Sequence, residues 1–93
     1  MKLVVKKSFS KNFKKTPPHI QKQTLEILKL LKDCESLETS GVDYVEMEGQ
    51  NKDENYYRIR VGGYRIGIEL IEPSIIMVTI LPRGDIYKKF PPK

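Results

Sequence analysis

Residue types that build many catalytic and metal sites are scarce in this chain. Its 93 residues include one cysteine, one histidine and no tryptophan. The single cysteine, Cys34, excludes a disulfide within the chain, which is typical of proteins in a reducing cytoplasm. Because zinc sites need clustered cysteine and histidine ligands, we expect no metal and no cofactor. Nothing in the sequence pairs Cys34 with His19, so we interpret the cysteine as a half-buried residue at a helix end.

Long apolar segments are also missing. No stretch reaches the roughly 18 apolar residues that a membrane span requires, and the apolar run near Leu3 is too short for a signal-peptide core. The sequence therefore predicts a cytoplasmic protein without membrane contact. Its length predicts one domain over residues 1–93, and a composition of 39% hydrophobic and 31% charged residues is typical of globular proteins.

Basic residues outnumber acidic ones. The chain has 17 lysines and arginines against 12 aspartates and glutamates, which gives a formal net charge of +5. A charge of this sign favours polyanions or acidic protein partners. Many basic proteins bind no nucleic acid, so the placement of these residues matters more than their number.

The apolar pattern predicts an α+β fold with the order β-α-α-β-β-β-β. A β-branched run at residues 3–6 is expected as the first strand, and Ser8 or Ser10 is expected to cap a short basic helix after it. A second helix, residues 18–34, has Pro18 in its first turn. Apolar residues recur along this helix at helical spacing and predict its buried stripe. The stripe comprises Ile20, Thr24, Ile27, Leu28, Leu31 and Cys34, widened by Leu25 and Leu30.

Four strands are expected to follow the helices as an antiparallel meander, with the two helices on one sheet face. Gly62-Gly63 is a strong signal for a two-residue hairpin turn. The last strand is almost wholly apolar, which predicts a central position in the sheet. The second sheet face is expected to be open or covered from outside the chain. The expected strands are residues 44–48, 56–61, 64–71 and 75–81, with a polar loop at 49–55 and a basic tail at 82–93.

The hairpin turn determines which residues share a sheet face, because side chains alternate along a strand. A two-residue turn pairs Arg60 with Arg65 and Arg58 with Gly67, on the face away from the helices. Two arginines directly opposite each other destabilise the sheet by a few tenths to ~1 kcal/mol, and a polyanion bound between them would make the pair stabilising instead. Arginine also pairs with phosphate through two parallel donors. We predict a phosphate-binding face; the alternative is a solvated strand face with ordinary arginines. The helix-facing set is Tyr57, Ile59, Val61, Tyr64, Ile66 and Ile68.

Two further residues bear on this arginine face. Gly67 removes a side chain beside Arg58, and a glycine inside a strand marks either the close approach of another backbone or a bulge. If the turn at residues 72–74 holds three residues, Arg65 pairs with Leu81, and Arg83 emerges on the arginine face. A two-residue turn would reverse the facing of Arg83.

Two segments resemble the RelE/ParE superfamily of toxins. Residues 57–66, YRIRVGGYRI, are similar to the central hairpin of that family. Residues 82–90, PRGDIYKKF, are similar to its closing segment, which is often His-Arg-Arg-Asp-Val-Tyr-Arg. The element order also matches along nearly the whole chain. The sequence is thereby identified as a member of this superfamily, closest to its RelE-type branch, with residues 1–93 as a single RelE-like toxin domain.

The resemblance implies a function. RelE-type members are toxins of type II toxin–antitoxin systems that cleave messenger RNA in the ribosomal A site and inhibit translation during stress. It therefore implies a metal-independent endoribonuclease whose partners are the ribosome, its mRNA and a cognate antitoxin. Carried over by position, it implies five catalytic residues. Arg58 and Arg60 match two basic strand residues, often lysines, at the cleavage site. Arg65 matches the arginine that binds the scissile phosphate, and Arg83 matches the arginine that stabilises the transition state or protonates the leaving group. Tyr87 matches a tyrosine that stacks on a base or assists proton transfer. The four arginines are also the implied RNA-binding set.

The sequence departs from the family pattern at the expected general base. Arginine stays protonated, so Arg58 and Arg60 cannot easily accept a proton, and Pro82 stands where several relatives have histidine. Water, Glu48 or Glu69 remains as the base, or the activity is low; Glu69 is better interpreted as a salt-bridge partner. Two alternative functions stay open. One is a ParE-like gyrase inhibitor, a class that usually lacks the full basic set. The other is a degenerate member that binds only its antitoxin or DNA.

Overall fold

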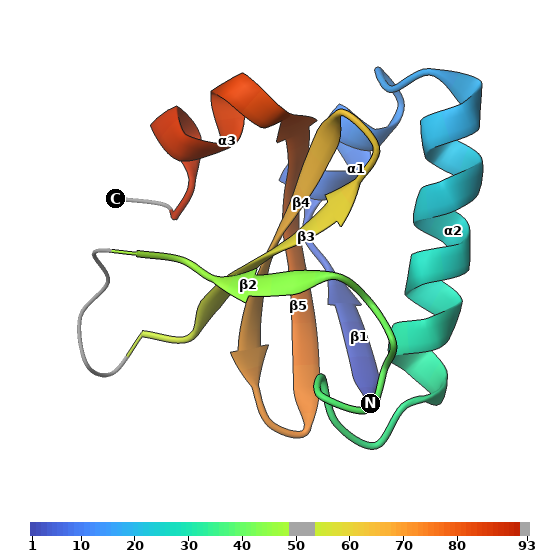
Figure 1. Ribbon diagram of the computed structural model, residues 1–93, viewed down its shortest axis with the longest axis vertical. Coiled ribbons are helices and arrows are strands. Elements are labelled where there is room, and N and C mark those ends of the chain that lie inside the picture. The colour runs from blue at the N-terminus through green and yellow to red at the C-terminus, as the bar shows by residue number, and fades with distance from the viewer. Residues whose placement is uncertain (49–53, 92–93) are drawn as a thin grey trace.

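The computed structural model describes residues 1–48 and 54–91, which form a five-stranded sheet and three helices (Figure 1). The sheet has the order β1-β5-β4-β3-β2. The expected α+β fold is confirmed, with a C-terminal helix in addition. None of the helices in this described part of the chain is long and apolar enough to cross a membrane. The elements are β1 (Lys2–Val5), α1 (Lys7–Phe13), α2 (Pro18–Asp33), β2 (Tyr44–Glu46), β3 (Tyr56–Val61), β4 (Tyr64–Ile71), β5 (Ser74–Pro82) and α3 (Arg83–Lys89).

Strand β5 lies inside the sheet, as its apolar composition predicted. It pairs in parallel with β1, from Lys2↔Ser74 to Val5↔Met77, and antiparallel with β4 on its other side. A parallel neighbour requires a crossover connection, and here α1 to β4 all lie between the two strands in sequence. The loop expected at residues 49–55 lies mostly outside the described residues.

Helix α2 packs one narrow stripe against the sheet. Ile20, Thr24 and Leu31 are buried, which confirms the core of the predicted stripe. The widening of that stripe is wrong: Leu25 is 57% exposed and Leu30 is 46% exposed. Both side chains lie about 100° around the helix from a buried neighbour. The helix is at the surface of the molecule (Figure 1), so the sheet covers only the side that faces it.

Helix α1 is not capped by a serine. Its N-cap residue is Lys6, which makes no side-chain capping hydrogen bond. The Ser8 hydroxyl instead donates to the carbonyl oxygen of Val78 at 2.5 Å, and the Asn12 amide donates to the Thr79 hydroxyl at 2.8 Å. These bonds attach α1 to β5 just beyond the point where β1 ends.

The second sheet face is partly covered by α3, which corrects the expectation that this face is open or covered from outside the chain. Ile86 and Phe90 are 0% and 3% exposed and form a small core with Met47 and Val78. Figure 1 shows α3 on the side of the sheet away from α2. A helix of seven residues with one buried side chain is too short to show helical periodicity, which is why the tail received no predicted element.

A bulge in β5 corrects the predicted turn but preserves its consequence. The turn holds two residues, because Ile71 pairs with Ser74. The register then shifts by one between Gly67 and Ile68, which makes Val78 the extra residue. The extra residue moves the pairing beyond the bulge by one position and so restores the register that a three-residue turn would give. Arg65 therefore pairs with Leu81.

Candidate active site

The β3–β4 hairpin has the predicted register. Arg60 pairs with Arg65 and Arg58 pairs with Gly67. The turn residue Gly62 has a φ of 57°, a left-handed conformation that glycine adopts without strain. The helix-facing side chains are buried, at 0% exposure for both Ile59 and Ile66. The alternation of the strands therefore places all three hairpin arginines on the opposite face.

Arg65 is the most enclosed of these arginines, with 9% of its surface exposed. Its Nη1 donates to the carbonyl oxygens of Gly62, at 2.9 Å, and Tyr64, at 2.8 Å. These two bonds use both Nη1 hydrogens. The Nε hydrogen and the two Nη2 hydrogens have no hydrogen-bond partner among the described residues, and Nε–H and one Nη2–H form a parallel pair that suits two oxygens of a phosphate.

The electrostatic environment of Arg65 contains every other residue of the predicted site. Burial lowers the pKa of its guanidinium most, followed by the positive charges of Arg60 and Arg83, and a smaller contribution comes from Arg58. Tyr87 acts in the opposite direction. Among the described residues no carboxylate contributes to this pKa. The folded protein thus holds a cation among cations, an arrangement that a bound anion would stabilise.

Arg83 is held next to the hairpin by the backbone. It is the first residue of α3, and its N–H donates to the carbonyl oxygen of Gly63 at 2.9 Å. Its side chain is exposed. Because its positive charge also acts on Arg65, Arg83 lies beside the arginine face, which is the outcome predicted for a three-residue turn.

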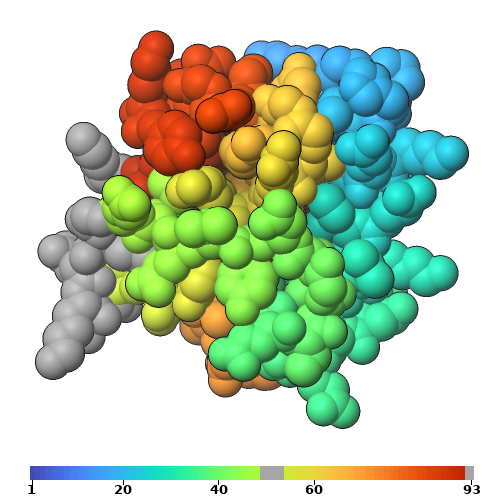
Figure 2. All heavy atoms as spheres, viewed as in Figure 1, coloured from blue at the N-terminus to red at the C-terminus, as the bar shows by residue number. Residues whose placement is uncertain are grey.

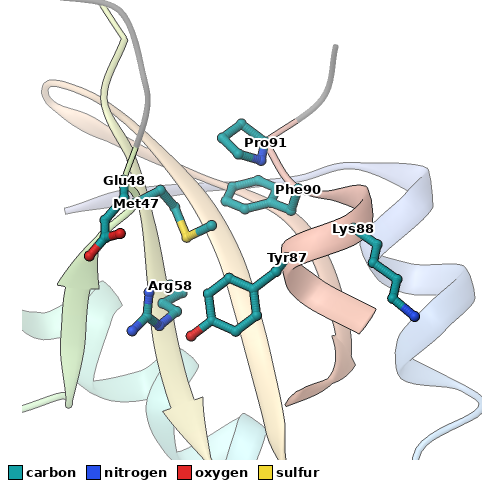
Figure 3. Close-up of a pocket in the computed structure, with 7 residues that line it drawn as sticks. All are labelled: Met47, Glu48, Arg58, Tyr87, Lys88, Phe90 and Pro91. Atoms are coloured by element: carbon teal, nitrogen blue, oxygen red, sulfur yellow. The ribbon is translucent and has the colours of Figure 1, made fainter. Parts of the chain in front are cut away.

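Tyr87 lies over Arg58. The Arg58 Cζ atom is 5.1 Å from the centroid of the tyrosine ring, which is a cation–π contact. Tyr87 is 57% exposed, so the rest of its ring is accessible. Figure 3 shows the ring and the guanidinium side by side, with Lys88 pointing away from them. They border a pocket of about 390 Å³ lined by Met47, Glu48, Arg58, Tyr87, Lys88, Phe90 and Pro91.

Phe90 holds α3 against the sheet, a role that the sequence analysis missed. A Cβ atom added to Gly67 would lie 2.8 Å from the Phe90 ring, far inside van der Waals contact. The ring also packs edge-on against Tyr56, with centroids 5.4 Å apart. The close approach that Gly67 predicted is therefore real, although an aromatic ring makes it instead of a backbone. The alternative, a bulge, is present as well. Because Tyr87 lies less than one turn before Phe90, this contact also positions Tyr87.

The described residues of α3, β2 and the hairpin gather on one face of the molecule. In the space-filling view (Figure 2), α3 in red and β2 in green lie on either side of the yellow hairpin. All five predicted residues are thus brought together at this point. The arrangement can bind a phosphodiester group and provides one accessible aromatic ring beside it.

Comparison with known proteins decides the family. No protein-family model matches the chain. It is 41% identical to "Toxin RelE3" of Methanocaldococcus jannaschii over 91 residues, which cover 98% of this chain and 100% of the relative. The chain belongs to the RelE family of toxins.

Solved structures agree with this RelE-family assignment. The RelB–RelE antitoxin–toxin complex from Methanococcus jannaschii matches with a TM-score of 0.78 and 39% identity, over 95% of this chain and 99% of that one. The archaeal RelE–RelB complex from Pyrococcus horikoshii OT3 matches with a TM-score of 0.70 and 24% identity, over 89% and 94% of the two chains. The second likeness shows the fold alone.

Two carboxylates border the site of this RelE-family toxin. Glu48 shares the pocket beside Tyr87. Asp43, which the sequence analysis missed, lines a hollow of about 170 Å³ with Val45, Arg58, Arg60 and Arg65, and its carbonyl oxygen accepts the Arg60 N–H at 2.9 Å. Its only sequence signal is that it directly precedes an edge strand.

Glu69 shares the sheet face of Arg58, but it does not line either of the hollows that Arg58 lines. It pairs with Tyr56 and lines a different hollow. Burial raises the pKa of the Tyr56 hydroxyl, and the negative charges of Glu69 and Glu54 raise it further. Cys34 lies at the C-terminal end of α2, where its half-buried thiol donates to the Leu31 carbonyl oxygen at 3.0 Å. The interpretation of Cys34 as a packed helix-end residue is confirmed.

Proposed function

We propose that this RelE-family toxin is a metal-independent endoribonuclease that cleaves mRNA in the ribosomal A site and inhibits translation in the cytoplasm. The observation that carries the proposal is the fixed Arg65 guanidinium, which has a pair of donors unbound by any described residue and three further arginines around it. The resemblance of the hairpin and of the closing segment to RelE-type enzymes supports the same reaction.

RNA cleavage of this type uses the 2′-hydroxyl of the substrate as the nucleophile, so the protein needs to supply position and charge rather than a nucleophile. The free edge of Arg65 holds two oxygens of the scissile phosphate. Arg60 and Arg83 offset the charge that develops on the phosphate and on the leaving oxygen. The Tyr87 ring, held over Arg58, stacks on a neighbouring base.

The proton acceptor in this proposal is a carboxylate or water. Every basic group at the site is an arginine, which does not release its proton at neutral pH. Asp43 and Glu48 border the site from the segments just before and just after β2, whereas Glu69 lines a separate hollow. A positioned carboxylate that accepts the proton contributes about 10²–10⁴-fold to rate.

Cleavage mapping in a translation extract tests the proposal. Wild-type protein is expected to cut translated messages, and Arg83→Ala is expected to cut about 10²-fold more slowly because one charge-stabilising donor is lost. Lys22→Ala, an exposed change on α2, is the matched control and should leave the cuts unchanged. Glu48→Gln and Asp43→Asn in the same assay identify the proton acceptor, since loss of the acceptor is expected to slow cleavage by about 10²–10⁴-fold while the other variant cuts like wild type.

Three outcomes would overturn this assignment in different ways. Intact messages together with blocked gyrase supercoiling would establish a ParE-like inhibitor. Intact messages without any effect on gyrase or translation would establish a degenerate member that only binds. Equal cleavage of free mRNA without ribosomes would keep the nuclease and remove its dependence on the ribosome.

We also propose that a cognate antitoxin of the RelB type neutralises this toxin. The relative from Methanococcus jannaschii was solved with RelB, and a net charge of +5 suits an acidic segment that folds on binding. The antitoxin is expected to cover Arg65 and Arg83 or to displace α3 together with Tyr87. A crystal structure of the complex in which all three residues stay accessible and ordered would contradict this prediction.

A further inference from the structure

A second basic surface lies on α1 and the two residues that follow it, outside the arginine cluster. A shallow groove there is lined by the four lysines Lys7, Lys11, Lys14 and Lys15 together with Val5 and Ser10. All four lysines are exposed, and no acidic residue of the described chain lines the groove. Lysines three or four residues apart repel one another by a few tenths of a kcal/mol per pair. We call this surface the α1 lysine groove.

The α1 lysine groove has a rigid base. Phe9 on the opposite side of α1 is 3% exposed and belongs to the main core. The hydrogen bonds of Ser8 and Asn12 to β5 hold the same helix on its flank. The backbone of α1 is therefore fixed to the sheet, while the exposed lysine side chains extend from it as a row of positive charges.

The groove continues toward the arginine cluster. Lys15 also lines a second hollow with Asn12, Thr16, Tyr64, Ile80, Leu81 and Pro82. Tyr64 and Pro82 directly precede Arg65 and Arg83, and the Tyr64 carbonyl oxygen accepts a hydrogen bond from Arg65. Figure 1 shows α1 at the same end of the sheet as α3 and the hairpin turn. Lys15 thus connects the groove to the end of the sheet that carries Arg65 and Arg83, although the Tyr64 side chain faces the helices and that of Arg65 faces the opposite side.

We propose that the α1 lysine groove binds the phosphodiester backbone of an RNA strand that extends beyond the arginine cluster. The inference rests on the proposed function in taking RNA as the polyanion. Lysine is a flexible point charge, and the groove contains no aromatic ring on which a base could stack. Binding is therefore independent of sequence and dependent on salt. An acidic amphipathic peptide fits less well, because Val5 is the single apolar side chain in the lining.

Salt-dependent binding of a non-cleavable RNA tests this inference. Fluorescence anisotropy is measured with 2′-O-methyl RNAs of 4 and 12 nucleotides, for wild type and for the triple variant Lys7→Gln, Lys11→Gln and Lys14→Gln. Loss of three phosphate contacts to a single strand is expected to reduce the slope of log K against log salt by about 2 for the longer RNA. The shorter RNA is expected to bind both proteins equally, because the arginine cluster alone can hold it.

The matched control is Lys22→Gln, Lys29→Gln and Lys32→Gln on α2, which removes the same charge from another face. An equal fall in slope for both triple variants, or none for the α1 variant, would overturn the inference. Lys11→Glu alone provides a second variant if the α1 triple variant melts at a lower temperature than wild type. Weaker binding of polyglutamate with unchanged RNA binding would assign the groove to an acidic protein instead.

The two proposals fail separately. Ribosomal cleavage that depends on Arg83, with RNA binding unaffected by the α1 variant, removes only the α1 lysine groove. A reduced slope in a protein that cuts no message keeps the groove as an RNA-binding surface and removes the nuclease.

Discussion

Arg65→Lys is expected to lower the single-turnover rate of mRNA cleavage by about 10²–10³-fold, the effect of losing one preorganised donor at a developing negative charge. Arginine at this position does two things at once. Its Nη1 is bound to the Gly62 and Tyr64 carbonyl oxygens, while its other edge is free for two phosphate oxygens. An ammonium group has no second edge, so a lysine bound to those carbonyls cannot also hold a phosphate in two-pronged fashion.

The measurement is cleavage of a programmed ribosome with excess toxin, together with urea unfolding of the free protein. The lysine variant keeps the positive charge and can still donate to a carbonyl oxygen, so its stability should remain close to wild type. Arg60→Lys is the matched control, because Arg60 is exposed and no hydrogen bond of its side chain to the described residues is found. A cleavage rate for Arg65→Lys equal to that of Arg60→Lys would refute a special role for the fixed guanidinium.

Gly67→Ala is expected to destabilise the fold by about 1–3 kcal/mol, the usual cost of forcing extra volume into a packed site. The added Cβ would meet three atoms of the Phe90 ring at 2.8 to 2.9 Å. Phe90 is buried on the sheet, so the ring and the end of α3 must move away. The move would separate Tyr87 from Arg58, and cleavage should fall even where the variant remains folded.

Urea unfolding measures the first effect, and cleavage below the melting temperature measures the second. Gly84→Ala is the control within α3, because a Cβ there meets nothing within 4 Å. It should stabilise the helix by up to about 1 kcal/mol. Combining Gly67→Ala with Phe90→Leu should recover part of the lost activity, since neighbouring changes couple. Full activity of Gly67→Ala alone would show that Phe90 does not position Tyr87.

The hairpin shows how far a sequence pattern can reach. A two-residue glycine turn between two alternating strands allows one register, so the pairing of Arg60 with Arg65 followed directly from local rules and is confirmed. The pairing of Arg65 with Leu81 was also confirmed, yet for another reason. That pairing was predicted only for a three-residue turn, whereas the structure has a two-residue turn and a bulge at Val78. The turn is one residue shorter and the bulge adds one residue to β5, so the two changes cancel in the register.

The failures have a common cause. Leu25 and Leu30 fit the helical period as well as the buried residues do, and only the width of the contact between α2 and the sheet excludes them. Ser8 is a good capping residue by type, but its hydroxyl reaches Val78, which is 70 residues away in the chain. In each case a distant segment decides the partner of a locally ambiguous side chain.

By itself the sequence determined the element order, the hairpin register and the face on which the arginines gather, because periods of 2 and 3.6 residues and turn chemistry act over a few neighbouring residues. The tertiary structure alone decided that α3 covers the second face, that Phe90 fills the space above Gly67 and that Tyr87 consequently lies over Arg58. It also placed Asp43 and Glu48 at the border of the site. These contacts join segments far apart in the chain, and their geometry depends on packing that no local pattern encodes.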